Sequence, residues 1–339
     1  MRRAARESVA MTAPRRKFGK VLLTGQPMLY VCLLLVAISA SYIYEARTRT
    51  IFACQARGYT PDRYLAYCHG ASYADYEHGA FLFDLEPSAR DFARKADVLF
   101  LGNSRMEIGL STAATSNWFS SASASYYLMG FGYNENEAFE GKLLRTIQPQ
   151  AKVYVINVDD FFVSTETAPA KAVFHNPEAR SQYERKKSWQ NIHESICGRF
   201  AGFCGNKYTI FRSRRTGAYY PQSRESVAAV TPVSYDDAVQ PEVVDRQAAA
   251  ATAFLSRFAA GKCVILMVTP YVRTQLGNAR AIAERLGKTL VTVGNVGGLR
   301  TFDGSHLDQP SAARWSQAFL QAAGPEIRSC LRKQGAAPS

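Results

Sequence analysis

The sequence predicts an α/β domain built on a parallel five-stranded sheet with helices on both faces, preceded by one transmembrane helix. Three observations predict this architecture. Five short apolar runs alternate with helical patterns between residues 97 and 322, which is typical of a parallel sheet. One long uncharged segment lies near the N-terminus. Apolar residues make up 47% of the 339 residues, an ordinary globular content that excludes disorder as the main state.

The N-terminal segment predicts a membrane anchor. Residues 1–20 form a basic tail of net charge +6, and residues 21–44 carry no charge. At about 1.5 Å per residue, this run is long enough to cross a hydrocarbon core of about 30 Å. Because positive charges stay inside, we expect a single-pass protein of the bacterial inner membrane, with its N-terminus cytoplasmic and the rest periplasmic. A cleaved signal peptide is the alternative.

The basic net charge does not by itself indicate nucleic-acid binding. The total is +13, and about half of it lies in residues 1–20. The remaining basic residues form no dense stripe and accompany no nucleic-acid motif. We therefore expect the lipid bilayer, and no nucleic acid, as a partner.

The cysteines indicate an oxidising compartment. Beyond the apolar run there are six, an even number without CxxC spacing, which predicts three disulfides. Nearness in sequence favours Cys54–Cys68 and Cys197–Cys204, and leaves Cys263 to pair with Cys330. Six buried free thiols are the alternative. Ligand spacing with carboxylates or cysteines is absent at His69, His78, His175 and His193, so we expect no metal and no cofactor.

The elements follow in order. Residues 45–96 are expected to form an irregular, aromatic-rich extension near the membrane, ending in a short helix at 88–95. The domain itself spans 97–323, interrupted by a polar insertion at 163–243 that covers or borders the site, and 324–339 is a tail. Strands are expected at 97–101, 125–129, 152–158, 263–268 and 289–293, and helices at 135–147, 244–260, 275–286 and 309–322.

Polar residues with catalytic chemistry follow the first and the fifth predicted strands. Ser104 lies at a strand-to-helix turn, and Asp303 and His306 lie after the last strand. Parallel sheets bind ligands beyond the carboxyl ends of their strands, so both segments fall where a site is expected. The aspartate orients the imidazole, which then removes the proton of the serine. A helix-capping serine and an ordinary surface loop are the alternatives.

These segments carry a family resemblance. Gly102-Asn103-Ser104-Arg105 and Asp303-Gly304-Ser305-His306 resemble the first and last blocks of the SGNH (GDSL-like) hydrolase superfamily, over about residues 97–323. The resemblance implies a flavodoxin-like fold, a Ser104–His306–Asp303 triad, and an oxyanion hole with an amide from Gly130 or Gly132.

The chain departs from the family pattern at the third block. Asp159 stands where the family has an oxyanion-binding asparagine, so it is either protonated, turned away, or replaced by another donor such as Asn134. Arg105 follows the serine. We count Gly130, Gly132, Arg105, Asn134 and Asp159 as candidate oxyanion or substrate-binding residues.

The GNSR segment, the anchor and the exported topology look most like the SGNH-like proteins that O-acylate cell-surface polymers. The resemblance implies an O-acyltransferase that uses a Ser104 acyl-enzyme, receives the acyl group from a membrane-bound O-acyltransferase, and acetylates a polysaccharide. An SGNH esterase or deacetylase is one alternative. A non-catalytic subunit of a polysaccharide assembly machine is the other.

Overall fold

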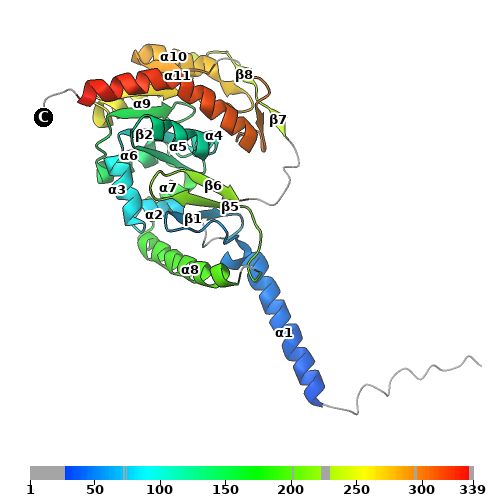
Figure 1. Ribbon diagram of the computed structural model, residues 1–339. Coiled ribbons are helices and arrows are strands. Elements are labelled where there is room, and N and C mark those ends of the chain that lie inside the picture. Colours follow the sequence, from blue (N-terminus) through cyan, green and yellow to red (C-terminus); the bar gives the residue numbers. More distant parts are fainter. Residues whose placement is uncertain are drawn as a thin grey trace, which may run out of the picture. The chain divides into compact units, whose positions relative to one another are not determined.

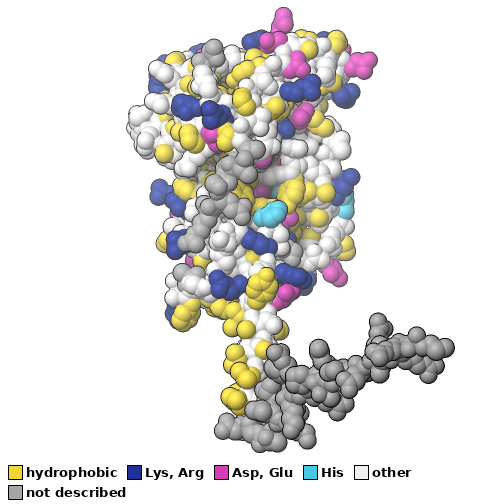
Figure 2. All heavy atoms as spheres, turned by 90° about the vertical axis from the view of Figure 1, so that its right-hand side faces the viewer, with side chains coloured by type: hydrophobic (Ala, Val, Ile, Leu, Met, Phe, Trp, Pro, Cys, Tyr) yellow, Lys and Arg dark blue, Asp and Glu magenta, His cyan; other side chains and the backbone are white. Residues whose placement is uncertain are grey.

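The computed structural model describes residues 27–71, 73, 75–200, 202–222, 230–293 and 296–335. The predicted basic tail, residues 1–20, lies outside the described residues. The chain divides into two compact units, Met1–Glu45 and Ala46–Ser339. Helix α1 (Pro27–Arg49) is long and apolar enough to cross a membrane, as either an anchor or an N-terminal signal. Its apolar side chains are exposed (Figure 2).

The second unit contains all the other elements (Figure 1). In chain order they are η1 (Ile51–Ala53), β1 (Arg63–Cys68), α2 (Glu77–Leu82), α3 (Pro87–Lys95), β2 (Val98–Asn103), α4 (Ser104–Gly109), α5 (Thr112–Ser121), β3 (Tyr126–Phe131), α6 (Glu137–Ile147), β4 (Val153–Asn157), α7 (Ala168–Phe174), α8 (Ala179–Arg199), β5 (Thr209–Ser213), β6 (Tyr219–Gln222), β7 (Thr231–Pro232), β8 (Tyr235–Asp236), α9 (Pro241–Phe258), β9 (Cys263–Met267), β10 (Thr274–Gln275), α10 (Leu276–Leu286), β11 (Thr289–Val291), β12 (Arg300–Thr301) and α11 (Gln309–Gly335).

The main sheet has five strands in the order β11-β9-β4-β2-β3, and every neighbouring pair is parallel. The predicted five-stranded parallel sheet is therefore confirmed. Its strands deviate from the expected ranges by a few residues: β3 extends to Phe131, so that Gly130 lies inside the strand, beside Gly102 of β2. Because all five strands are parallel, the loops that follow them open at one edge of the sheet.

Both faces of this sheet are buried. One face packs against α3, α6, α9 and α10, through side chains such as Phe139 and Leu143. The other face packs against α4, α5 and α11, through Phe119, Trp315 and Phe319. Because both faces are covered, the central strands are buried at every residue rather than at alternate residues.

A second sheet joins the extension to the insertion. Strand β1 pairs antiparallel with β5, which pairs antiparallel with β6. The expectation that residues 45–96 are irregular is therefore wrong for the strand and for α2. Tyr64, Tyr76 and Phe81 of this segment are buried. The partner of β1 lies about 145 residues further along the chain, so no local pattern indicated the strand.

The last helix is longer than expected. Residues 324–339 are predicted as a tail, but α11 continues to Gly335 and includes Pro325. A proline inside a helix costs about 3 kcal/mol. Ala323, Ile327 and Cys330 are nevertheless buried against the sheet, and Cys330 is bonded to Cys263. Tertiary packing thus maintains the helix past its local stop signal.

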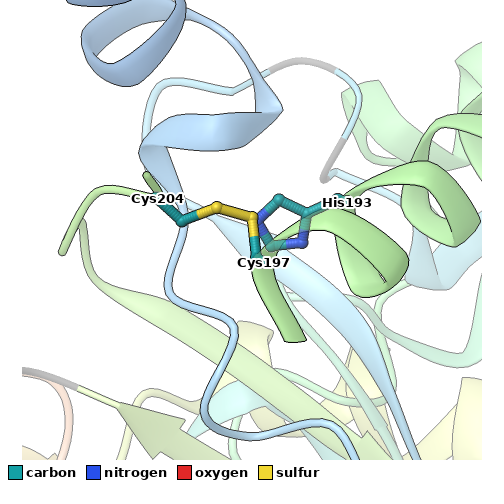
Figure 3. Close-up of side chains that lie close together, drawn as sticks. All are labelled: His193, Cys197 and Cys204. Carbon is teal, nitrogen blue, oxygen red and sulfur yellow. A yellow bond between two sulfur atoms is a disulfide. The ribbon is translucent and has the colours of Figure 1, made fainter. Parts of the chain in front are cut away.

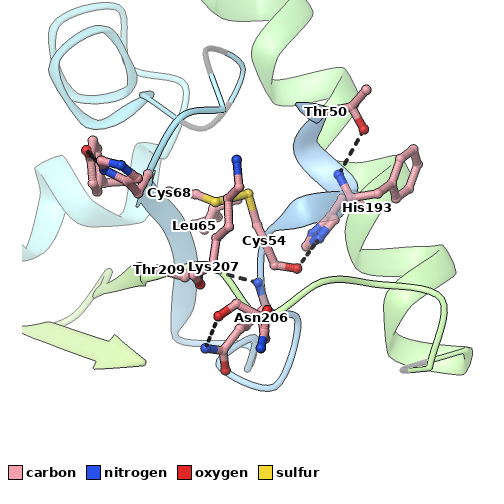
Figure 4. The surroundings of a disulfide bond; sticks show 12 residues. Thr50, Cys54, Leu65, Cys68, His193, Asn206, Lys207 and Thr209 are labelled. Carbon is pink, nitrogen blue, oxygen red and sulfur yellow. Dashed lines mark hydrogen bonds between the residues drawn. A yellow bond between two sulfur atoms is a disulfide. The ribbon is translucent and has the colours of Figure 1, made fainter. Parts of the chain in front are cut away.

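The three predicted disulfides are confirmed. They are Cys54–Cys68, whose surroundings Figure 4 shows, Cys197–Cys204 and Cys263–Cys330. The first joins β1 to the segment after α1, and the second closes the end of α8. The third ties the start of β9 to α11. Each connects elements of the second unit, which agrees with an oxidising compartment.

Candidate active site

Ser104 lies where β2 turns into α4. The side chain that caps this helix is Asn103, whose Oδ1 accepts a hydrogen bond of 3.0 Å from the Arg105 amide. Ser104 is therefore the first helical residue and not the N-cap. The capping alternative for this serine is wrong, and its hydroxyl is free to point toward the loop that carries His306.

The loop after β12 holds its aspartate and histidine in a tight turn. Asp303 Oδ1 accepts hydrogen bonds from the amides of Ser305 (2.9 Å) and His306 (2.7 Å). Gly304 adopts a φ of +83°, a conformation that a side chain would disfavour, and its carbonyl accepts from the Val272 amide. These bonds leave Asp303 Oδ2 directed at the imidazole.

The structure brings Ser104, Asp303 and His306 together. His306 Nε2 lies 2.9 Å from Ser104 Oγ, and His306 Nδ1 lies 2.7 Å from Asp303 Oδ2. Burial alone would raise the pKa of Asp303, but its hydrogen bonds to the imidazole of His306 and to the amides of Ser305 and His306 outweigh burial and hold this pKa below its usual value. An ionised Asp303 only accepts, so Nδ1 carries the proton and Nε2 accepts from the serine hydroxyl.

Arg105 and Asp159 form an ion pair beside the triad. Arg105 Nη1 contacts Asp159 Oδ2, and the hydroxyl of Tyr271 donates to Asp159 Oδ1 over 3.0 Å. The guanidinium also lies over the Tyr271 ring, 4.3 Å from its centroid. Its Nε donates to Ser305 Oγ over 3.0 Å. The arginine thus links the turn after β4 to the loop of His306.

This arrangement explains how a carboxylate is tolerated at the third-block position. Burial raises the pKa of Asp159, and the positive charge of Arg105 opposes this effect. Both carboxylate oxygens are directed at Arg105 and Tyr271. Asp159 is therefore engaged by these partners and does not act as a free anion in the site.

The two glycines proposed as oxyanion donors have other partners. The Gly130 amide donates to Glu107 Oε1 over 2.8 Å, and the Gly132 amide donates to Glu77 Oε1 over 2.9 Å. Neither amide is available to an oxyanion in this arrangement, so the predicted oxyanion role of Gly130 and Gly132 is wrong. Glycine at 130 has a packing reason instead: a Cβ there would lie 2.7 Å from Cγ of Glu107. Asn134 is exposed in the loop after β3, and no hydrogen bond among the described residues joins it to Ser104.

Several buried ionisable residues lie near the strand ends that lead to the site, and the sequence analysis did not predict them. Arg212 of β5 is fully buried and contacts both Glu77 and Glu107 at 3.3 Å, and the Leu128 carbonyl at 2.9 Å. Glu140, also fully buried, accepts from the Gly102 amide over 3.2 Å. One signal was present: Glu107 is three residues after Ser104, on the same turn of helix.

Two groups of potential metal ligands occur among the described residues, and both contain a disulfide. They are His193 with Cys197 and Cys204, shown in Figure 3, and Glu326 with Cys263 and Cys330. A sulfur bonded to another sulfur is not a thiolate ligand. The two nitrogens of His193 already lie 3.0 Å from the Tyr59 hydroxyl and 3.3 Å from the Cys54 carbonyl.

Basic and acidic side chains are interspersed on the molecular face seen in Figure 2, rather than gathered by sign.

Comparisons of the chain with protein-family models, with curated proteins and with solved structures give no match. The chemistry of this site is accordingly inferred from its own geometry.

Proposed function

We propose that this chain is an exported, membrane-anchored O-acyltransferase of SGNH type, which transfers acetyl groups to a polysaccharide through an acyl-enzyme on Ser104. One observation carries the proposal: Ser104 Oγ, His306 and Asp303 lie in hydrogen-bonded sequence at 2.9 Å and 2.7 Å. Ser104 follows β2, at the edge of the parallel sheet where ligands bind, and the loop of Asp303 and His306 follows β12, which pairs with β7 in a separate two-stranded sheet. Helix α1 and the three disulfides support an exported, membrane-bound location.

The first half-reaction acylates the enzyme. His306 Nε2 takes the proton of Ser104 as Oγ attacks the carbonyl carbon of the acyl donor. The tetrahedral intermediate collapses, the bond to the leaving group breaks, and His306 returns the proton to that group. Asp303 stabilises the imidazolium that forms between these steps. Because the amides of Gly130 and Gly132 already donate to glutamate carboxylates, we assign oxyanion stabilisation to the backbone amide of Ser104, at the start of α4.

The second half-reaction transfers the acyl group. A sugar hydroxyl loses its proton to His306 and attacks the ester carbonyl. The bond to Ser104 Oγ breaks, and the serine regains its proton from His306. The acyl donor is proposed to be supplied by a membrane-bound O-acyltransferase, as the family resemblance implies, and the acceptor is a polysaccharide.

One observation favours hydrolysis as a second candidate. The Asp303 side chain is 40% exposed and that of His306 is 19% exposed, so water reaches the triad. With water in place of the sugar hydroxyl, the same residues perform an esterase reaction.

The test is to trap the acyl-enzyme. The purified full chain is mixed with p-nitrophenyl acetate, and acetylated peptides are located by mass spectrometry. We expect acetate on Ser104, none in Ser104→Ala, and an unchanged result in Ser121→Ala, which removes an exposed serine of α5. Failure to acetylate Ser104 would overturn the nucleophile assignment and leave the non-catalytic assembly subunit. Added cello-oligosaccharide separates the two reactions, since a transferase yields acetylated sugar and an esterase yields only acetate.

A further inference from the structure

Helix α8 carries an exposed apolar stripe. Trp189 is 40% exposed and Ile192 is 42% exposed, while Phe200, at the helix C-cap, is 66% exposed. At 3.6 residues per turn, Trp189, Ile192, Ile196 and Phe200 fall within about 80° of one another around the helix axis. Tyr73, 41% exposed, extends this surface, because its ring lies 5.7 Å from that of Trp189.

The acidic residues of α8 lie away from the stripe, whereas its basic residues occur both beside the stripe and, as Arg180 and Lys187, on the opposite side. Arg185 and Arg199, both exposed, fall within about 60° of the centre of the stripe. The acidic residues of the helix, Glu184 and Glu194, lie more than about 100° away. An apolar stripe flanked by basic residues is typical of a helix that lies in the interface of an anionic bilayer.

The chain connection keeps α8 close to the end of α1. Only Thr50 separates α1 from η1, and the Phe52 ring of η1 lies 6.0 Å from His193 of α8 and 5.4 Å from Phe203. Three residues span at most about 10 Å, so this part of α8 cannot move far from Arg49. Figure 4 shows Thr50, Cys54 and His193 close together.

Two disulfides hold the residue after η1 and the end of α8 within the second unit. Cys54, whose carbonyl contacts His193, is bonded to Cys68 of β1, and Cys197 of α8 is bonded to Cys204. In α1, the residues after the uncharged run are Glu45 to Arg49, which rise about 7.5 Å. That length is close to one headgroup layer, about 5–8 Å thick. If α1 spans a bilayer, the chain therefore leaves this helix at about the level of the lipid headgroups.

We propose that α8 docks on the bilayer surface, with Trp189, Ile192 and Phe200 inserted among the lipid headgroups and Arg185 and Arg199 facing anionic lipid. The occupant of the stripe is lipid, because the covalent connection brings the bilayer within reach and the flanking charges complement it. This contact would hold the body against the membrane and restrict the directions in which the triad opens. The proposal depends on α1 lying in a membrane and is independent of acyl transfer.

The test uses tryptophan fluorescence of the full chain in vesicles of phosphatidylethanolamine and phosphatidylglycerol with brominated acyl chains. The chain has three tryptophans, and Trp315 is buried. We expect brominated lipid to quench the wild-type emission and Trp189→Phe to remove most of that quenching. Equal quenching in wild type and Trp189→Phe would overturn the proposal. The proposal is also overturned if aqueous iodide quenches Trp189 as strongly in vesicles as in detergent. This second result is the one expected if a protein partner, and not lipid, covers the stripe.

A matched pair of variants separates the stripe from charge alone. Ile192→Asp with Phe200→Asp should abolish most of the Trp189 quenching by brominated lipid. Asn191→Asp with Ser195→Asp adds the same charge at exposed positions of α8 away from the stripe. This pair should retain the quenching of Trp189 by brominated lipid. Equal loss in both pairs would attribute the contact to charge and overturn the stripe. If the full chain does not enter the vesicles at all, α1 is not an anchor and the proposal fails with it, whereas acetylation of Ser104 is unaffected.

Discussion

Arg105 Nε donates a hydrogen bond of 3.0 Å to Ser305 Oγ, and so joins the helix of Ser104 to the loop of His306. The same guanidinium forms the ion pair with Asp159. Both side chains of the pair are largely buried, with 12% and 4% of their surfaces exposed. The residue that follows the candidate nucleophile therefore positions the histidine loop and also neutralises a carboxylate beside the site.

Arg105→Met should destabilise the protein, because it leaves Asp159 buried without its charge partner. Removing one member of a buried pair costs about 3–5 kcal/mol. Adding Asp159→Asn removes the orphaned charge, so the double variant should recover most of the free energy of unfolding but not the position of the His306 loop. Denaturant unfolding measures the first effect, and the rate of Ser104 acetylation measures the second. Additive losses in the double variant would contradict the pairing.

Gly130→Ala should impair the site through packing. The new Cβ would lie 2.7 Å from Cγ of Glu107, which is on the helix of Ser104, and 2.9 Å from the carbonyl oxygen of Asn103, the residue before Ser104. Overpacking of this kind costs about 1–3 kcal/mol. We expect a lower melting temperature together with slower Ser104 acetylation. Gly198→Ala, on α8 with no neighbouring atom within 4 Å of the new Cβ, is the control: it should leave the acetylation rate unchanged and should not lower the melting temperature, because alanine favours a helix over glycine.

The disulfides should differ in their contribution to stability. Cys263–Cys330 closes 67 residues and Cys197–Cys204 closes 7, so loop entropy predicts losses of about 4 and about 2 kcal/mol when each pair is replaced by alanine. Non-reducing mass spectrometry of the native chain checks the pairing itself, and denaturant unfolding checks the order. Recovery of six alkylatable thiols from the native protein would exclude the pairs.

Glu140→Gln should alter how stability depends on pH. Burial raises the pKa of Glu140 well above its usual value, so the folded state holds this proton more tightly than the unfolded state. The stability linked to the proton is present below the unfolded pKa of about 4.3 and is lost as pH rises through the folded pKa. The melting temperature of the variant relative to wild type should therefore increase as the pH rises from about 5 into the alkaline range. A difference that stays constant over this range would show that Glu140 is ionised in the folded state.

The membrane topology is testable with reporters. We expect alkaline phosphatase fused after residue 71 to be active, because the chain beyond α1 is predicted to be periplasmic. The same enzyme fused after residue 20 should be inactive, because that segment is predicted to be cytoplasmic. Activity at the first site with release of the protein into the soluble fraction would indicate a cleaved signal instead of an anchor. The reversed pattern would overturn the localisation.

The sequence alone determined the features that depend on nearby residues. Apolar runs such as Leu99–Leu101 and the helical patterns between them predicted the parallel sheet, because strand and helix formation follow the periodicity of a short segment. The positions of Ser104 and His306 after strands predicted that they meet, since parallel strands share one edge. The cysteine pairs followed from nearness in sequence and from elimination.

Only the tertiary structure decided the details that depend on residues distant in sequence. Whether the Gly130 amide is free depends on Glu107, and the orientation of Glu107 depends on Arg212 of the insertion. The ionic environment of Asp159 depends on Arg105, which lies in α4, and on Tyr271, which lies in the segment after β9. Strand β1 exists because β5 supplies its hydrogen bonds. Hydrogen bonds and ion pairs depend on which residues are close in space. These residues are distant in sequence, so the sequence alone does not show which of them will meet.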